Sequence, residues 1–247
     1  MARRTFRRRL VLAAAVAATA AVAAMLYQRA PGGAAGPAPA ARPSSTPAAQ
    51  PSARLPAVPS RPAVSVAGVR MANFHGVMLP VSAADGPRDR HRGLSSGYSD
   101  TPLGAVLAAV NIAVRATPQF GPRIFRPTIA RQVTGPDTPA LLASCASAYD
   151  QAARAANVGY GQPLGRVFVA EAGFRLVAWT PAQATVDIAS TGPGPQGMTV
   201  RAATRVGLEW LAGDWRVVAP PGGDWAAAAA ELPSLDGFTR FPHQAGG

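Results

Sequence analysis

Residues 206–218, VGLEWLAGDWRVV, contain the clearest structural signal in the chain. Large apolar and polar residues alternate on both sides of Gly213 and Asp214, and this period of two is typical of half-buried strands. A Gly-Asp pair suits the tight reversal of a β-hairpin. We therefore predict antiparallel strands over 208–211 and 215–218, joined by a short turn.

The same alternation extends upstream of this hairpin. Residues 165–181, GRVFVAEAGFRLVAWTP, and 184–191, ATVDIAST, carry Val, Phe, Trp and Thr between turn residues. Together with the hairpin they predict four or five antiparallel strands. Downstream, Asp224 precedes the letters WAAAAAEL, which predict a short capped helix over 225–232.

The first half of the domain has the rhythm of helices instead. A helix is predicted over 102–116, because Thr101 is a suitable N-cap and Pro102 suits the first helical position. Its apolar stripe consists of Leu103, Val106, Leu107, Val110 and Val114. Similar signals predict a second helix over 127–133 and a third over 139–156. Helices followed by an antiparallel meander describe an α+β domain over residues 64–247, with the N-terminal helices packed on a curved sheet.

The chain opens with a basic segment and then an apolar one. Residues 1–9 contain five Arg, and the next 18 residues, 10–27, are uncharged. A length of roughly 20 residues crosses a bilayer as a helix, and flanking Arg keeps its own side cytoplasmic. We therefore expect a cytoplasmic tail over 1–9, one transmembrane helix over 10–27, and a domain outside the cell membrane.

A cleaved leader is the alternative for this opening segment. RRTFR at 3–7 has the twin-Arg spacing, and APAA at 38–41 offers small residues for cleavage. The second pattern lies further from the apolar run than a signal peptidase usually cuts. We prefer the interpretation of an uncleaved anchor. Under either interpretation the domain is exported.

Residues 28–63 form a linker between this segment and the domain. Nine Pro and eleven Ala lie in 30–63, without any acidic residue and with few large apolar ones. Such a composition cannot build a core and predicts a disordered, extended spacer.

The formal charge of +12 is unevenly distributed along the chain. Nine of the 24 Arg lie before residue 64, which leaves 15 Arg against 12 acidic residues in the domain. The domain lacks clustered Arg with interleaved aromatic residues, so we do not expect it to bind nucleic acid directly.

Four acidic residues are candidates for general acid or base catalysis, namely Asp150, Glu171, Asp187 and Glu209. Asp187 lies between Val186 and Ile188 in a strand, and Glu209 between Leu208 and Trp210. The alternation predicts that both carboxylates point to solvent while their neighbours pack inward.

Histidine and cysteine give no metal pattern. His75, His91 and His243 have neither His-x-x-x-His spacing nor an accompanying Cys, and the single Cys145 lies in an apolar helical pattern that predicts a small core residue. We therefore assign no catalytic, cofactor-binding or metal-binding residue, and we expect no cofactor.

Three segments of the domain have the composition of loops. Residues 95–97, SSG, read as a loop before the first helix and not as a nucleophile elbow. Residues 190–197, STGPGPQG, carry two Pro and no Lys, which predicts a hairpin tip and a candidate contact surface. Residues 88–93, RDRHRG, are either a solvated loop or a contact for an acidic partner or cell-wall polyanion.

The hairpin VGLEWLAGDWRVV resembles the closing strands of the cystatin-like, nuclear-transport-factor-like superfamily, which implies a cone in which one long helix crosses a bent sheet. The blocks SGYSDTPLGAVLAAVNIAV, GDWRVVAPPGGDW and LDGFTRFP are similar to proteins carried by actinobacterial integrative conjugative elements. Tail, span, linker and cone together resemble the layout of bitopic scaffold subunits of type IV secretion and conjugation machines.

This resemblance implies a non-enzymatic, membrane-anchored scaffold of a conjugative DNA-transfer apparatus. Its partners would be other envelope or conjugation proteins or a second copy of the chain, and no small molecule is expected. The alternative is a secreted small-molecule-binding protein or an isomerase-like or dehydratase-like enzyme of the same fold. An inward-facing Asp or His beside an apolar cavity would favour the enzyme, and a filled cone without ionisable groups would favour the scaffold.

Overall fold

The computed structural model describes residues 64–242. The α-helices of this part are α3 (Pro102–Arg115), α4 (Pro122–Gln132) and α5 (Thr138–Ala156). The strands are β1 (Val69–Phe74), β2 (Val77–Ser82), β3 (Val133–Thr134), β4 (Ala170–Trp179), β5 (Gln183–Pro193), β6 (Thr199–Leu211), β7 (Asp214–Val218), β8 (Ala229–Glu231) and β9 (Thr239–Arg240). Short 3₁₀ helices lie at Pro118–Phe120, Pro195–Gly197, Pro221–Gly223 and Trp225–Ala228.

Seven of these strands form one sheet, with the order β3-β7-β6-β5-β4-β9 and with β8 also paired to β6. All of its pairs are antiparallel except β3 with β7. Strands β1 and β2 form a separate antiparallel hairpin. The predicted α+β class is confirmed, and the sheet is larger than the four or five strands predicted.

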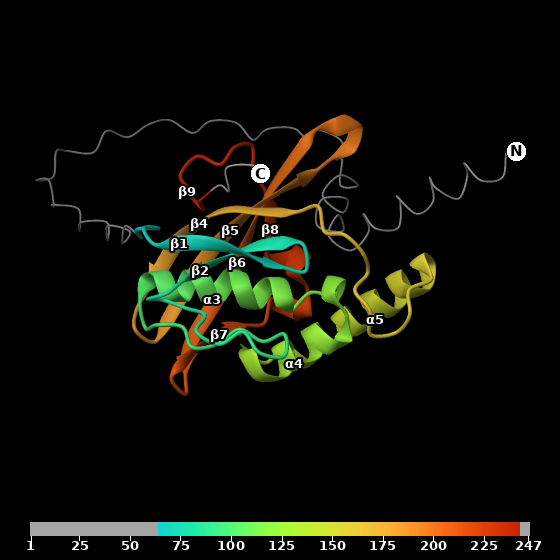
Figure 1. Ribbon diagram of the computed structural model, residues 1–247, viewed down its shortest axis with the longest axis horizontal. Coiled ribbons are helices and arrows are strands. Elements are labelled where there is room, and N and C mark those ends of the chain that lie inside the picture. The colour runs from blue at the N-terminus through green and yellow to red at the C-terminus, as the bar shows by residue number, and fades with distance from the viewer. Residues whose placement is uncertain (1–63, 243–247) are drawn as a thin grey trace, which may run out of the picture.

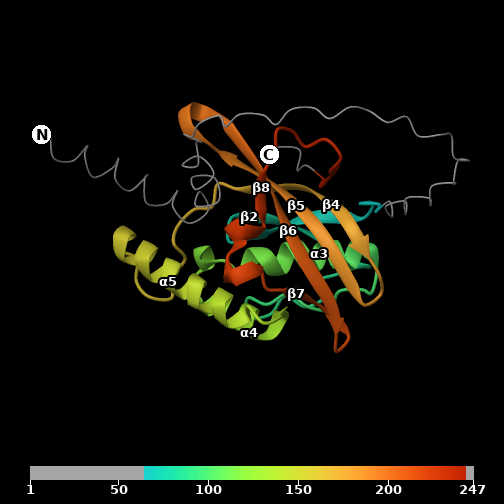
Figure 2. The same ribbon diagram turned by 180° about the vertical axis from the view of Figure 1, so that it is seen from behind.

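Helix α3 lies between the β1–β2 hairpin and the large sheet (Figures 1 and 2). It contacts β2 on one side and β4 to β7 on the other. Residues 104–113 are all buried. Because the helix is covered on opposite sides, it needs apolar or small residues around its whole circumference and not only along the predicted stripe.

Most helix boundaries follow the predicted start and stop signals. The Thr101 hydroxyl accepts a hydrogen bond from the Gly104 amide, and α3 ends at Arg115, one residue before the predicted end. Helix α5 begins one residue earlier than expected. Helix α4 begins at Pro122, five residues before the predicted start, because Pro122 occupies its first turn and Pro127 is accommodated inside the helix.

The predicted hairpin is confirmed as β6 and β7, but its turn consists of Ala212 and Gly213, both with positive φ, and Asp214 begins β7 opposite Leu211. Its turn also positions the segment that precedes α3. The Asp214 carboxylate accepts hydrogen bonds from the amides of Gly97 at 2.8 Å and Tyr98 at 3.1 Å. These two hydrogen bonds join residues that are more than 100 positions apart in the chain. Asp214 therefore stabilises the tertiary structure in addition to the hairpin.

The C-terminal segment crosses the face of the sheet that points away from α3. Leu235 and Phe238 pack on Ala189 of β5 and Ala203 of β6, and they form a second, smaller apolar cluster. The short helix predicted over 225–232 is wrong in its second half. A 3₁₀ helix capped by Asp224 ends at Ala228, and β8 follows because its backbone pairs with β6.

The predicted tail, span and linker, residues 1–63, lie outside the described residues. In residues 64–242, no helix combines the length and the apolar character that a membrane span requires.

Candidate functional site

The most distinctive polar feature of the domain is Arg115, the last residue of α3, which is only 2% exposed. Its Nε donates to the Gly93 carbonyl at 3.1 Å, and its Nη1 donates to the carbonyl and side-chain oxygens of Asn111, each at 2.9 Å. Carbonyl groups at a helix C-terminus favour a nearby cation. The end of α3 therefore holds Arg115 in place without a carboxylate.

Three elements close around this guanidinium. The Asn111 side-chain amide donates to the Pro80 carbonyl at 2.8 Å, which joins α3 to β2. The Phe74 ring at the end of β1 lies over Arg115, with 3.9 Å between Cζ and the ring centroid. Gly93 has a φ of +79°, a left-handed conformation that glycine adopts readily, and this conformation lets its carbonyl face Arg115.

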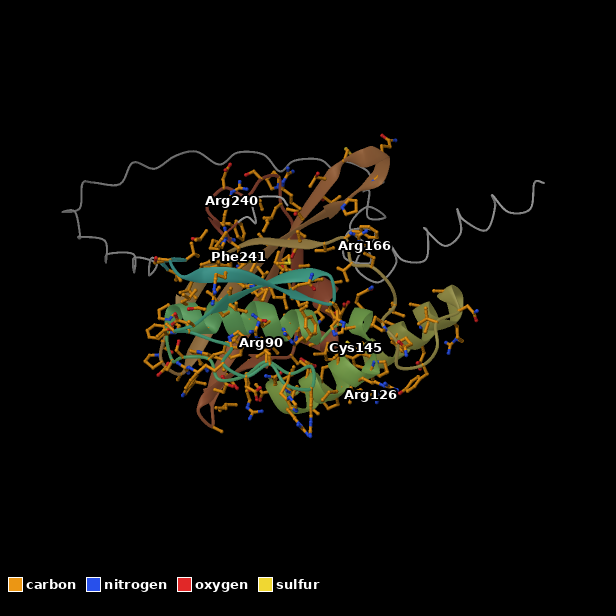
Figure 3. All side chains as sticks on the ribbon, in the orientation of Figure 1. Arg90, Arg126, Cys145, Arg166, Arg240 and Phe241 are labelled. Atoms are coloured by element: carbon orange, nitrogen blue, oxygen red, sulfur yellow. The ribbon has the colours of Figure 1, made fainter. Side chains whose placement is uncertain are left out.

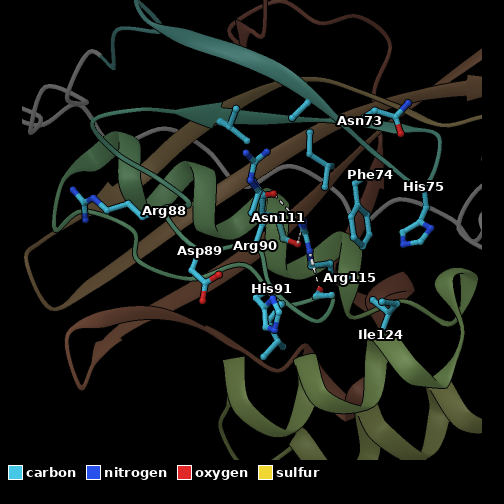
Figure 4. A pocket seen from close by; sticks show the side chains of 15 residues that line it. Asn73, Phe74, His75, Arg88, Asp89, Arg90, His91, Asn111, Arg115 and Ile124 are labelled. Carbon is cyan, nitrogen blue, oxygen red and sulfur yellow. Dashed lines mark hydrogen bonds between the residues drawn. The ribbon is translucent and has the colours of Figure 1, made fainter.

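A cavity of about 660 Å³ opens beside these residues, between the β1–β2 hairpin, the loop 88–94 and the ends of α3 and α4 (Figure 4). Its apolar lining includes Phe74, Leu79, Leu94 and Ile124. Its charged and imidazole lining consists of Arg88, Arg90, Arg115, Asp89, His75 and His91. This volume is in the range of small-molecule sites, which run to roughly 300–1,000 Å³.

The lining is predominantly cationic, with three Arg against the single Asp89. In the described part of the chain, both ion pairs are formed by Asp187, so neither Arg90 nor Arg115 is paired with a carboxylate. Burial lowers the pKa of Arg115 to about 10; the nearby Tyr98 raises it, and the positive charge of Arg90 lowers it further. Arg115 remains charged at neutral pH, and the cavity can therefore attract an anion.

Three further exposed arginines lie away from the cavity. Figure 3 places Arg126 on α4, Arg166 before β4 and Arg240 on β9, around the outline of the domain and apart from Arg90. These three arginines therefore do not add to the positive charge that lines the cavity.

The predicted solvent-facing position of Asp187 is wrong. Its side chain is 3% exposed and forms ion pairs with Arg175 at 2.7 Å and Arg205 at 2.8 Å. The C-terminal segment buries this side of β5, and the Phe238 ring lies 4.6 Å from Arg175 Cζ. Burial alone raises the pKa of Asp187, but the hydrogen bonds and charges of Arg205 and Arg175 outweigh it and leave the pKa below its usual range.

The remaining candidates are dispersed. Asp150 is exposed on α5 and Glu209 is half-buried on β6, whereas His75 and His91 line opposite parts of the cavity. His243 lies outside the described residues. Cys145 is buried as predicted, and burial raises its thiol pKa to about 12. Within residues 64–242, no three His, Cys, Asp or Glu side chains are grouped closely enough to hold a metal ion.

The predicted loops are found in their expected positions. Residues 95–97 precede α3, with Ser95 fully buried and its Oγ accepting a hydrogen bond from the Tyr98 hydroxyl. Residues 190–197 lead into the tip between β5 and β6. Residues 88–93 form one wall of the cavity instead of a purely solvated loop.

Glu171 is half-buried on β4 and accepts a hydrogen bond from the Ser190 hydroxyl at 2.7 Å. Burial raises its pKa to about 7, and the Ser190 bond opposes this shift. The folded chain then holds a proton that the unfolded chain releases near pH 4. The stability contribution of this proton is fully present below about pH 4 and is lost as the pH rises through about 7.

Replacing Glu171 by Gln is therefore expected to raise the free energy of unfolding at pH 8 by about 1–2 kcal/mol and to leave it nearly unchanged at pH 4. This value is reduced from about 1.4 kcal/mol per pKa unit because the carboxyl is partly solvated. Urea unfolding across this pH range measures the effect. Glu209→Gln removes the same charge from the same sheet as a control, and parallel pH profiles of Glu171→Gln and the parent would contradict the expectation.

The part of the large sheet that packs against α3 is lined by apolar side chains. Phe174, Leu176, Val186, Ile188, Val206 and Leu208 are buried there against the helix. Asp187, Arg175 and Arg205 lie on the opposite face, in accordance with the period of two. Apolar side chains thus fill the space between α3 and these positions of the sheet. Glu171 and Ser190, which are paired in the register, lie on the same face of the sheet beyond Ile188.

Arg115 and Asn111 are not among the site candidates predicted from the sequence. The available signal was a pair of polar residues four positions apart in an otherwise apolar helix, LAAVNIAVR at 107–115. Residues at i and i+4 lie on the same face, so the pair could have been recognised as a polar patch. Its burial depends on the β1–β2 hairpin, which is distant in sequence from the end of α3.

Comparison with known families matches residues 27–240 to a family described as Domain of unknown function (DUF8175). The match covers most of the chain and includes the predicted linker together with nearly all of the described domain. No curated protein and no solved structure matches the chain.

Proposed function

We propose that this chain, which belongs to the DUF8175 family, is a membrane-anchored and non-enzymatic scaffold or interaction protein. In this proposal residues 10–27 span the cell membrane, residues 1–9 are cytoplasmic, and a linker carries the domain outside. The domain is a cystatin-like cone and serves a conjugative, type IV secretion-like apparatus. Its partners are other envelope or conjugation proteins, or a second copy.

The observation that carries the non-enzymatic part of the proposal is the filled interior of the cone. A cone-shaped enzyme places an acid or base in a cavity between helix and sheet, where desolvation adjusts its pKa. Here Val186, Ile188 and Val206 occupy that space against α3, and Asp187 points to the other face. The domain is therefore better suited to presenting surfaces than to enclosing a substrate at this position.

The tip of the β5–β6 hairpin is the contact surface that the fold favours. The two strands extend past the body of the domain, at the upper right of Figure 1. Met198 at the tip is 55% exposed, and Gln196 has a left-handed φ of 54° that holds the turn. An exposed apolar residue on a protruding hairpin is suited to a protein partner, and membrane tethering raises the local concentration of weak contacts.

A photo-crosslinking amino acid at Gln196, in the full chain with a carboxyl-terminal tag and an actinobacterial host, tests this proposal. We expect the full-length mass to remain in membranes after alkaline carbonate washing, and we expect a discrete crosslinked protein or a dimer. The same amino acid at Gln151, an exposed glutamine on α5, is the matched control. A soluble species lacking its first 30 to 40 residues, or equal crosslinking from both positions, would contradict the proposal.

The alternative is a secreted small-molecule-binding protein or enzyme with a cleaved leader. The cavity beside Arg115 favours the binding form of this alternative, because it is large enough for a small ligand. It lies between α3 and the β1–β2 hairpin, not inside the cone. A soluble, processed species in the experiment above would favour this alternative over the scaffold.

A further inference from the structure

We propose that the cavity beside Arg115 binds a phosphate monoester, with Arg115 and Arg90 as the groups that hold the phosphate. This inference does not depend on the proposed scaffold function. It follows from the chemistry of the cavity, which brings a buried guanidinium, a second guanidinium and an apolar wall together. Figure 4 shows the arrangement, with Arg88 pointing away from the other two arginines.

Arg115 is a buried cation whose charge no described side chain neutralises. Its Nε and Nη1 are satisfied by neutral oxygens of Gly93 and Asn111, and Nη2 has no hydrogen-bond partner in residues 64–242. Both described ion pairs belong to Asp187, on another face of the domain. Isolated buried charges are costly, so a buried guanidinium with a free edge at a cavity indicates an anionic partner.

Arg90 supplies a second guanidinium to the same cavity. It is exposed, and within the described chain it has neither an ion-pair nor a hydrogen-bond partner. Its positive charge acts on Arg115, which places the two cations within electrostatic reach of each other. Two like charges repel, and an anion between them removes this repulsion while using donors that otherwise have no partner.

The charge and size of the cavity favour a phosphate monoester over a carboxylate. A monoester carries about −1.5 to −2 charges at neutral pH and offers three acceptor oxygens, whereas a carboxylate carries one charge. Guanidinium groups match phosphate geometry through paired N–H donors. The cavity of about 660 Å³ exceeds the size of a phosphate group, and Leu79, Leu94 and Ile124 offer an apolar wall for the ester carbons.

The direct test is isothermal titration of the full-length chain, in detergent, with phenyl phosphate. Arg90→Gln removes one of the two guanidinium groups without breaking a described contact, and we expect it to weaken binding about tenfold. Arg92→Gln is the matched control, because Arg92 lies in the same loop and loses the same charge but does not line the cavity. We expect its affinity to stay within about twofold of the parent, as screened surface charges contribute little.

Arg115→Lys provides a second measurement that keeps the positive charge at the buried position. A Lys has no planar fork, so we expect weaker phenyl phosphate binding in a chain that retains its circular dichroism spectrum. If this variant fails to fold, the comparison of Arg90→Gln with Arg92→Gln still tests the proposal, because both positions are exposed.

Two further probes identify the class of ligand. Dimethyl phosphate has a single charge and the diester chemistry of lipid headgroups and wall polymers, and we expect it to bind more weakly than phenyl phosphate. Acetate is expected to bind more weakly still. Absence of phenyl phosphate binding by the parent chain, equal weakening by Arg90→Gln and Arg92→Gln, or equal affinity for acetate or dimethyl phosphate would each overturn the proposal of a phosphate monoester site.

Discussion

Replacing Trp215 by Ala is expected to lower the free energy of unfolding by about 3–5 kcal/mol, as large-to-small changes at buried aromatic positions do. The Trp215 side chain is 1% exposed, and its ring meets Trp210 edge-on with 5.2 Å between centroids. Its Nε1 donates to the Ser99 carbonyl at 2.9 Å, just before α3 begins. The substitution thus leaves a cavity in the core. It also removes the hydrogen bond between β7 and the segment that precedes α3.

The two parts of this effect can be separated with Phe. Trp215→Phe keeps most of the apolar volume but leaves the Ser99 carbonyl without its donor, for an expected loss of about 1–3 kcal/mol. Trp179 is the matched control, because its buried Nε1 has no hydrogen-bond partner among residues 64–242. Trp179→Phe removes an unpaired donor and is expected to change stability little or to raise it.

Urea unfolding of the full-length chain, followed by far-ultraviolet circular dichroism, measures these variants without relying on tryptophan fluorescence. Equal losses for Trp215→Phe and Trp179→Phe would show that the Ser99 hydrogen bond contributes nothing. A loss below about 1 kcal/mol for Trp215→Ala would contradict the packing of this ring in the main core.

Removing Arg175 and Arg205 together is the second change with a large expected effect. Substitution of both by Ala leaves the Asp187 carboxylate buried and unpaired, and breaking a buried ion pair in this way lowers the free energy of unfolding by about 3–5 kcal/mol. The Arg175 and Arg205 side chains are 29% and 60% exposed, whereas that of Asp187 is 3% exposed. The Asp187 carboxylate, which is the most buried of the three groups, is therefore destabilised most when the two ion pairs are lost.

The pH dependence of this effect has a defined direction. In the parent chain the pKa of Asp187 is depressed, so its contribution is present at neutral pH and is lost only as the pH falls through that low pKa. In the double variant burial acts alone and raises the pKa, so the carboxyl accepts a proton at higher pH. We therefore expect the difference in stability between the two chains to be largest at pH 7 and to shrink toward pH 4.

Adding Asp187→Val to the double variant is the control, because it removes the buried carboxylate that has lost its ion-pair partners. Replacement of a whole buried ionic cluster by an apolar residue is often nearly neutral, so most of the lost stability should return. A double variant as stable as the parent at pH 7, or a triple variant no better than the double, would contradict this account of the cluster.

The contrast between Asp187 and its neighbours shows where sequence patterns lose information. Alternation correctly separates Val186 and Ile188 from Asp187, because side chains on a strand point to opposite faces. It does not show whether the second face meets water. That face is covered by Leu235 and Phe238, almost 50 positions later in the chain.

The candidate site was less predictable than the fold. The basic character of the 88–93 loop is evident from its residues, whereas neither the role of Arg115 nor the cavity is. Arg115 is flanked by ordinary helical residues, and only the β1–β2 hairpin and Gly93 make its environment distinctive. A long-range arrangement of this kind leaves little local trace in residue patterns.

Local sequence patterns specify the α+β class, the approximate positions of the three helices in the described domain, and the hairpin that turns at Gly213. These features follow from capping, turn chemistry and periodicity, which act between residues a few positions apart. Tertiary structure alone decided that α3 is covered on both sides, that Asp187 is buried with two arginines, and that Arg115 faces a cavity. The physical reason is that desolvation depends on segments that are distant in the chain and meet only in the folded domain.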